Sequence, residues 1–201
     1  NLNDKMDIKT DFFNSVAFTW DEMCHYDDKK IRFLLQLLEI CPNDSILDVG
    51  TGTGVLIPYF REVNPLGKII AIDNSPKMIE VAQKKFSQEK YTQFLISDVE
   101  LDCIHETFNH IVLYSVFPHI ENKIDTILKL INKNLKKDGK LLIAHSDSRN
   151  RLNNMHKRKN KSVCNDILID VQKQANLFSQ AGLHVKDAFE NEELYYLLLT
   201  Q

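Results

Sequence analysis

The stretch ILDVGTGTGVLIPYF, residues 46–60, decides the fold. Its first residues form a short apolar run, 45–49, typical of a strand buried on both faces of a sheet. The residues after the turn, 55–63, predict a helix that tolerates Pro58 in its first turns. Glycines at 50, 52 and 54 alternate through the turn and are half of the 6 glycines in the chain. A turn whose backbone lacks Cβ atoms at alternate positions and leads into a helix predicts a bound ligand there.

Strands and helices alternate along the rest of the chain. We expect further helices at residues 29–40, 75–87, 123–137 and 166–182, the second beginning at Ser75-Pro76, a pair that favours a helix start. We expect further strands at 68–73, 91–97, 108–115, 140–146, 183–190 and 193–200. Such alternation predicts a parallel α/β sheet with helices on both faces, and the short acidic turn between the last two strands predicts an antiparallel pair.

Composition and charge limit the possible functions. The 201 residues are 43% hydrophobic and 26% charged, which predicts one globular domain over residues 1–201. A net charge of −3 provides no overall basic field, so a nucleic-acid partner is not expected. No apolar run approaches membrane-spanning length, and the first ten residues are too polar for a signal peptide. Four scattered cysteines match no zinc template and predict reduced thiols in a cytoplasmic protein: Cys24, Cys41, Cys103 and Cys164.

The spacing of the glycines narrows the choice of ligand. A dinucleotide fingerprint needs its third glycine one position later, and a phosphate-binding P-loop needs a lysine that this turn lacks. The remaining pattern is D-x-G-x-G-x-G, residues 48–54. From about Lys29 to its end, the chain resembles the class I S-adenosylmethionine-dependent methyltransferases. This resemblance implies a three-layer αβα sandwich around a Rossmann-like, seven-stranded, mostly parallel sheet with an antiparallel last strand.

The resemblance also implies a set of cofactor-binding residues. In the family, an acidic residue ends the second strand, matching Asp73, and a carboxylate there can accept both ribose hydroxyls. Met78 and Asp98 match positions near the adenine, and the segment 113–120 matches the one beside the methionine moiety and the acceptor. The implied cofactor-binding residues are Asp48, Gly50, Thr51, Gly52, Gly54, Asp73, Asn74, Met78, Ser97, Asp98, Val99 and Tyr114.

The acceptor is predicted from what the chain lacks and from its histidines. No Asn/Asp-Pro-Pro-Tyr motif and no cysteine come directly after the fourth strand, so we expect a small molecule rather than a nucleic-acid base or a glutamine side chain, with protein or RNA as lesser options. His119 and His145 are candidate general bases because they follow strands and titrate near neutral pH. With His156 and Asp147 they offer the donors of a divalent-metal site, an alternative to the favoured metal-free site. The candidate acceptor-binding residues are Trp20, Phe117, His119, Arg149, Asn153 and His156.

Two segments flank the predicted sheet. Residues 1–28 resemble the family's cap over the cofactor, with Trp20 and Asp21 near the closure. Residues 147–165 form a polar insert in which Arg149, Asn153 and His156 recur at helical spacing, so that one face would point into the site. Its basic cluster is either a solvated surface run, which we favour, or a site that attracts an anionic substrate or RNA: Lys157, Arg158, Lys159 and Lys161.

Three functions remain open from the sequence. The leading hypothesis is a monomeric or homodimeric S-adenosylmethionine-dependent methyltransferase acting on a small molecule. The first alternative is a nicotinamide-dependent oxidoreductase, which the early third glycine and the antiparallel last pair disfavour. The second is a non-catalytic module that binds S-adenosylmethionine.

Overall fold

A seven-stranded sheet forms the centre of the computed structural model, which describes residues 2–23, 26–159 and 166–201. The strands lie in the order β3-β2-β1-β4-β5-β7-β6. β1 to β5 are parallel, and β7 is antiparallel to both β5 and β6, which confirms the predicted sheet. The bounds are β1 Ile46–Val49, β2 Ile69–Asp73, β3 Thr92–Ile96, β4 Phe108–Tyr114, β5 Leu135–His145, β6 His184–Glu190 and β7 Tyr195–Thr200.

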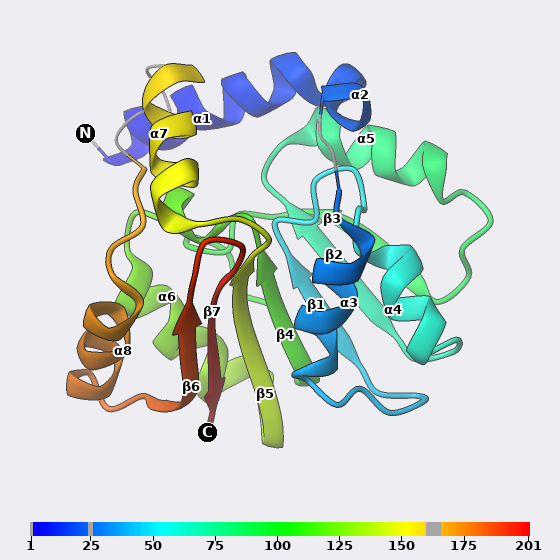
Figure 1. Cartoon of the computed structure of the whole chain (residues 1–201). Coiled ribbons are helices and arrows are strands. Elements are labelled where there is room, and N and C mark those ends of the chain that lie inside the picture. Colours follow the sequence, from blue (N-terminus) through cyan, green and yellow to red (C-terminus); the bar gives the residue numbers. More distant parts are fainter. Residues whose placement is uncertain (1, 24–25, 160–165) are drawn as a thin grey trace.

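Helices cover both faces of this sheet (Figure 1). One face carries α3 Asp28–Gln36, α4 Ile57–Val63 and α5 Pro76–Lys85. The other carries α6 Lys123–Lys129, its π-helical continuation η3 Leu130–Asn134, and α8 Val171–Gln180. A third group lies across the carboxyl ends of the parallel strands: α1 Leu2–Val16, η1 Ala17–Thr19, α2 Trp20–Met23 and α7 Arg149–Lys159, with the turn η2 Phe117–His119 nearby.

Each face of the sheet has its own apolar core. Neighbouring residues of one strand point to opposite faces, so Leu47 packs with α6 and α8 while Ile46 packs with α3 and α4. All four residues of β1 are buried for this reason. A strand between two helical layers therefore appears in the sequence as a continuous apolar run rather than an alternating one.

The structure corrects two of the predicted boundaries and adds one helix. The helix expected at 123–137 ends at Asn134, whose amide nitrogen donates to the carbonyls of Ile104 and Glu106, and β5 begins at the next residue. The helix expected at 166–182 begins only at Val171, because Asp170 caps it by accepting from two backbone amides. The N-terminal cap holds a 15-residue helix, α1, that its irregular apolar spacing did not predict.

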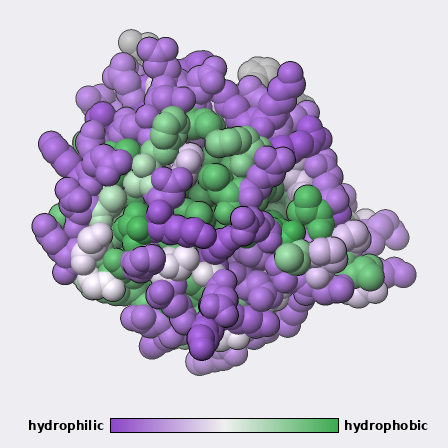
Figure 2. Space-filling view, turned by 60° about the horizontal axis from the view of Figure 1, so that its bottom comes forward, coloured by the Kyte–Doolittle hydropathy of each residue, from purple (hydrophilic) through white to green (hydrophobic). Residues whose placement is uncertain are grey.

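The surface of the described residues is largely hydrophilic. Figure 2 shows one region where apolar side chains gather, with hydrophilic side chains around it. No helix in the described ranges is both long enough and apolar enough to cross a bilayer. Cys41 and Cys103 are exposed free thiols, whereas Cys24, Cys164 and Lys161 lie outside the described residues.

Candidate active site

A cavity of about 520 Å³ lies at the carboxyl ends of β1, β2 and β4. The strand ends and the turns after them form one side, and α1, α2 and α7 contribute the other. A cavity at this edge is typical of open parallel sheets, because the loops that follow the strands diverge there. The elements predicted to flank the sheet therefore close over its ligand edge.

The glycine turn forms the floor of the cavity. Gly52 has a φ of +59°, which favours glycine, and a Cβ atom at this position would have no other heavy atom within 4 Å. Gly50 and Thr51 also line the cavity. Gly54 does not, since a Cβ atom there would lie 2.6 Å from the ring of Phe86. Gly54 therefore permits close packing of the turn, while Gly52 leaves open space for a ligand.

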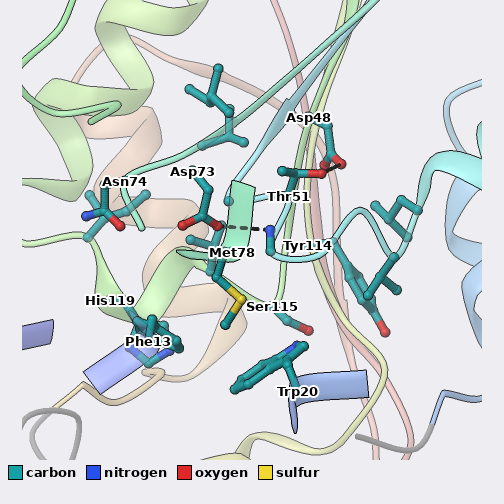
Figure 3. Close-up of a pocket in the computed structure, with 18 of the residues that line it drawn as sticks. Phe13, Trp20, Asp48, Thr51, Asp73, Asn74, Met78, Tyr114, Ser115 and His119 are labelled. Atoms are coloured by element: carbon teal, nitrogen blue, oxygen red, sulfur yellow. Dashed lines mark hydrogen bonds between the residues drawn. The ribbon is translucent and has the colours of Figure 1, made fainter. Parts of the chain in front are cut away.

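Two carboxylates, the buried one of Asp48 and the partly buried one of Asp73, stand beside this turn (Figure 3). Asp73 accepts from the backbone amides of Gly52 and Ser75, both at 2.9 Å, and burial nevertheless raises its pKa. Asp48 accepts from the hydroxyl of Thr51 at 2.7 Å, and burial raises its pKa to about 7. Neither carboxylate has a cationic partner among the described side chains, so both favour a ligand that carries positive charge or hydrogen-bond donors.

The remaining predicted cofactor residues follow β2, β3 and β4. Asn74, Met78, Ser97, Asp98, Val99 and Tyr114 all line the cavity. Of the twelve positions that the resemblance implied, Gly54 alone does not line it. Ser115 also lines it, with a φ of +58° that is unusual outside glycine and marks local strain at this strand end.

The cap reaches the cavity through aromatic side chains. The ring of Phe13 lies between those of Trp20 and His119, with centroids 5.9 and 5.3 Å away. These three rings lie on one side of the cavity, across from Asp48 and Asp73 (Figure 3). Asp21 anchors this part of the cap, since its carboxylate accepts from the Thr53 hydroxyl at 2.6 Å and from Lys85 at 2.8 Å. Trp20 is therefore held next to the glycine turn.

Lys30 is a cavity residue that the sequence did not single out. It comes from the first turn of α3, and its ammonium donates to the carbonyl of Ser146 at 3.5 Å. It has no carboxylate within ion-pairing distance among the described residues. A lysine near the start of an amphipathic helix is common on protein surfaces, so its sequence position carried no signal.

The three histidines predicted near the ligand edge have different environments. His119 lines the cavity, and its Nδ1 is 2.8 Å from a carboxylate oxygen of Asp166. His145 is only 2% exposed, neither ring nitrogen has a partner among the described residues, and burial lowers its pKa to about 3. It does not line the cavity, so the structure supports His119 and not His145 as a base in contact with a ligand.

Four of the predicted acceptor residues also lie outside the cavity lining. Phe117 is buried in the core against Phe178. Arg149 donates to Glu190, Asn153 pairs with the backbone of Leu168, and His156 donates through Nδ1 to the carbonyl of Asp166. The predicted helix in the insert is present as α7, but these last three side chains hold the segment that begins at residue 166.

A neighbouring side of α7 reaches the cavity. Arg151, Leu152 and Met155 line it. Leu152 and Met155 are the apolar residues of an otherwise polar helix and lie three positions apart, a spacing that places them on one face. This spacing was the available sequence signal. No group of three or more metal-binding side chains suited to an ion occurs within the described part of the chain.

Comparison with known proteins identifies the family. A family model described as a methyltransferase domain matches residues 40–198. A malonyl-[acyl-carrier protein] O-methyltransferase of Halalkalibacterium halodurans is 32% identical over 152 residues, which cover 70% of this chain and 55% of that protein. An (S)-coclaurine N-methyltransferase of Thalictrum flavum is 25% identical over 141 residues, covering 67% of this chain and 37% of that protein.

The chain spans about half the length of the first curated relatives that it matches. Among solved structures, a methyltransferase from Aquifex aeolicus that depends on S-adenosylmethionine has a TM-score of 0.70 at 19% identity, covering 92% of this chain and 97% of that one. This similarity shows a shared fold. Together with the match over residues 40–198, it establishes that the chain belongs to the S-adenosylmethionine-dependent methyltransferases of class I, Rossmann-like fold.

Proposed function

We propose that this protein transfers a methyl group from S-adenosylmethionine to a small-molecule acceptor. The observation that carries the proposal is the open space beside Gly52, bordered by the buried carboxylate of Asp48 and the partly buried one of Asp73. S-adenosylmethionine supplies a methyl group activated by its sulfonium. Positioning and the exclusion of water are then the main tasks of the protein.

The lining residues fit the chemical groups of this cofactor. Asp73 would accept from the ribose hydroxyls, and Asp48 offers negative charge toward a cationic ligand. Lys30, which lacks a carboxylate partner among the described residues, would bind the carboxylate of the methionine moiety. Met78, Asp98 and the backbone near them would hold the adenine. These side chains therefore match the ribose hydroxyls, the positive charge and the carboxylate of the cofactor.

The rest of the cavity supports a small acceptor. It is bounded by the cap aromatics Phe13 and Trp20 and by Leu152 and Met155 of α7. These side chains cover the strand ends and leave a cavity of about 520 Å³ for cofactor and acceptor together. The names of the two relatives specify an oxygen and a nitrogen acceptor, so the family leaves the acceptor atom open. The cytoplasmic location and the monomeric or homodimeric state stay predictions from the sequence.

Thermal unfolding with added ligands tests cofactor binding. A ligand at about 100 times its Kd stabilises the folded state by about 2.7 kcal/mol, which should raise Tm by roughly 5–10 °C for a chain of this size. We expect this shift with S-adenosylmethionine and S-adenosylhomocysteine and none with nicotinamide cofactors. The opposite pattern would support the oxidoreductase alternative and contradict the proposal.

A pair of glycine variants makes this test specific. Gly52 and Gly182 both have positive φ, and a Cβ atom at either has no other heavy atom within 4 Å. Gly52→Val and Gly182→Val should therefore suffer similar backbone strain. Only Gly52→Val should lose the shift with S-adenosylhomocysteine, because its side chain fills the cavity. A normal shift in Gly52→Val would show that the turn is only structural.

A further inference from the structure

A hydrogen-bonded group of charged side chains surrounds His119. Asp166 places one carboxylate oxygen 2.8 Å from Nδ1 of His119 and the other 2.8 Å from the ammonium of Lys9. Lys9 is 6% exposed and also binds Glu121 at 2.6 Å and the His119 carbonyl at 3.0 Å. Asp166 was not among the residues that the sequence indicated. It joins the segment after α7 to a histidine that lines the cavity.

The charge of Asp166 determines which nitrogen of His119 carries hydrogen. Burial raises the pKa of the Asp166 carboxyl, but the hydrogen bond from His119 and the Lys9 ammonium outweigh it and hold that pKa below its usual value. An ionised carboxylate only accepts hydrogen bonds, so Nδ1 must be the donor. In the neutral ring, the lone pair then lies on Nε2.

Lys9 and His119 contact the same carboxylate. The ammonium of Lys9 lies 2.8 Å from one oxygen of Asp166, and Nδ1 of His119 lies 2.8 Å from the other. The ion pair with Lys9 therefore fixes the carboxylate that orients the ring of His119. Other titratable groups also lie around His119. They are Glu121 and Lys123 beside η2, His145 at the end of β5 and His156 on α7.

We propose that Asp166 positions His119 so that Nε2 is the general base, and that the acceptor is therefore a hydroxyl compound that must lose a proton to be methylated. This inference rests on the proposed methyl transfer. The acceptor oxygen forms a bond to the methyl carbon as the carbon–sulfur bond breaks and its electron pair stays on sulfur. The hydroxyl proton moves to Nε2 of His119 and then to water. A carboxylate acceptor would need no such base.

The surroundings of His119 indicate the body of the acceptor. Phe13 packs edge-on against His119 and against Trp20, which forms a continuous aromatic wall along the cap. Leu152 and Met155 of α7 line the same cavity and are apolar. A flat apolar body bearing a hydroxyl, as in a phenol, complements such a wall through stacking and apolar contact. The structure thus favours phenols over acceptors with several charges.

Nuclear magnetic resonance of the histidine rings tests the tautomer without any substrate. Two-bond proton–nitrogen spectra of protein labelled with ¹⁵N-histidine distinguish the two neutral forms, and the missing signal in His119→Gln assigns the residue. We expect hydrogen on Nδ1 of His119 in the wild type at pH 7.5. Hydrogen on Nε2 instead would overturn the proposal.

Two isosteric variants separate orientation from the ion pair. Asp166→Asn can present a donor to Nδ1, so it should mix the tautomers of His119. Glu121→Gln removes the other carboxylate on Lys9 but leaves Asp166 in place, so it should keep the wild-type tautomer. Equal spectra for Asp166→Asn and the wild type would show that Asp166 is structural only.

Activity with defined probes tests the acceptor class. We expect S-adenosylhomocysteine to form with a panel of substituted phenols and not with the matching benzoates. General-base catalysis contributes about 100-fold or more, so Asp166→Asn should lower kcat for phenols about 10- to 100-fold with little change in KM, while Glu121→Gln stays close to the wild type. Turnover of benzoates alone, or of neither class, would contradict the acceptor class.

Calorimetric binding of S-adenosylhomocysteine keeps this test distinct from that of the proposed function. We expect equal affinity in the wild type, Asp166→Asn and Glu121→Gln, because none of these changes touches the glycine turn. A wild type that binds no S-adenosylhomocysteine would overturn the proposed function. Normal binding with phenol turnover unaffected by Asp166→Asn would overturn only the inference about Asp166.

Discussion

Asp73 links the glycine turn to β2, and it also lines the cavity. Its two oxygens accept from the amides of Gly52 and Ser75, so the turn holds the carboxylate in one orientation. Burial makes the charged form costly, and two amide donors offset only part of that cost. Further donors from a bound ribose would complete the hydrogen bonding. A carboxylate whose pKa is shifted by burial and whose hydrogen bonding is incomplete is expected where a ligand binds.

We predict that Asp73→Ala weakens the binding of S-adenosylhomocysteine by about 1.5–3 kcal/mol, the range for hydrogen bonds that involve a charged group. Isothermal titration calorimetry measures this directly. Asp125→Ala, which removes an exposed carboxylate in the first turn of α6, is the control and should bind normally. Unchanged affinity in Asp73→Ala would mean that the carboxylate serves only the turn.

The raised pKa of Asp48 leads us to predict that cofactor binding depends on pH. Its pKa is raised to about 7 by burial, so at pH 6 most of the free protein carries a neutral Asp48. A cation bound nearby favours the ionised carboxylate, so binding should release a proton. We expect the affinity for S-adenosylmethionine to fall by up to about tenfold per pH unit below 7.

Calorimetry in two buffers with different ionisation enthalpies counts the protons released. Asp48→Asn should bind more weakly at pH 8 and lose most of the proton release, because the amide cannot ionise. S-adenosylhomocysteine lacks the sulfonium charge and should show a smaller dependence on pH. An affinity for S-adenosylmethionine that is constant from pH 6 to 8 would contradict this role for Asp48.

At the residue scale, the predictable site residues are those whose role depends on the backbone. Gly52 and Asp73 sit in a turn whose geometry requires their residue types at a defined spacing, so a short motif indicates them. Lys30 and Asp166 act through side chains brought from distant parts of the chain. No local pattern marks such residues, because their contacts exist only after the sheet has formed.

At the element scale, the cap is attached to the sheet by polar contacts more than by apolar packing. Asn14 of α1 accepts from the Ser75 hydroxyl and from the amide of Lys77 at the start of α5. Asp21 of α2 binds Thr53 and Lys85. Contacts of this kind contribute modestly and can break one at a time. The cap is therefore suited to open for cofactor exchange without disturbing the two apolar cores.

We predict that Asp21→Asn loosens the cap around Trp20, the only tryptophan of the chain. The loss of the Lys85 ion pair should weaken cofactor binding by about 0.5–1 kcal/mol. It should also shift the emission of Trp20 to longer wavelength, because water gains access to the ring. Tryptophan fluorescence, recorded during titration with S-adenosylhomocysteine, measures both effects.

Asp11→Asn provides the matched control for this experiment. Asp11 lies on the exposed side of α1 and does not line the cavity. Its replacement should leave both the emission maximum and the affinity unchanged. If Asp21→Asn behaves like Asp11→Asn, the position of Trp20 does not depend on the contacts of Asp21.

The orientation of α7 shows why the face of a helix was harder to predict than its presence. Arg149, Asn153 and His156 have the correct spacing for one face, and the helix forms. The segment from residue 166 competes for that face, however, because it offers the carboxylate of Asp170 and the carbonyls of Asp166 and Leu168. The apolar Leu152 and Met155 consequently turn toward the cavity. The hydrogen-bonding partner of a polar side chain depends on which segments the fold places next to it, and the sequence alone does not specify that.

At the scale of the whole molecule, the sheet was predictable because its signals repeat. The inner parallel strands β1, β2 and β4 are largely buried on both faces, so each appears as an apolar run between helices. Strand order and handedness then follow from general rules for crossover connections. The cap lacks this regularity, since α1 has a weak amphipathic pattern and is held by individual polar contacts.

Two buried groups should give the stability of the free protein opposing dependences on pH. His145 has a pKa lowered to about 3, so between pH 3 and 6.5 the unfolded chain binds a proton there and the folded one does not. This contribution to stability is complete above pH 6.5 and is lost as pH falls. Asp48, with its pKa raised to about 7, has the opposite sign: between pH 3.8 and 7 the folded state holds the proton, so stability falls as pH rises.

We therefore predict that His145→Phe removes the contribution of His145 to the pH dependence of stability and leaves that of Asp48. The difference in unfolding free energy between wild type and His145→Phe should change by up to about 1.4 kcal/mol per pH unit below 6.5, in the direction that favours the variant in acid. Urea unfolding at pH 4.5, 5.5, 6.5 and 7.5 measures it. His105→Gln, which replaces an exposed histidine, should parallel the wild type. A constant difference for His145→Phe would show that the pKa of His145 is the same in the folded and unfolded states. The pH dependence of stability from buried groups would then come from the carboxylates alone.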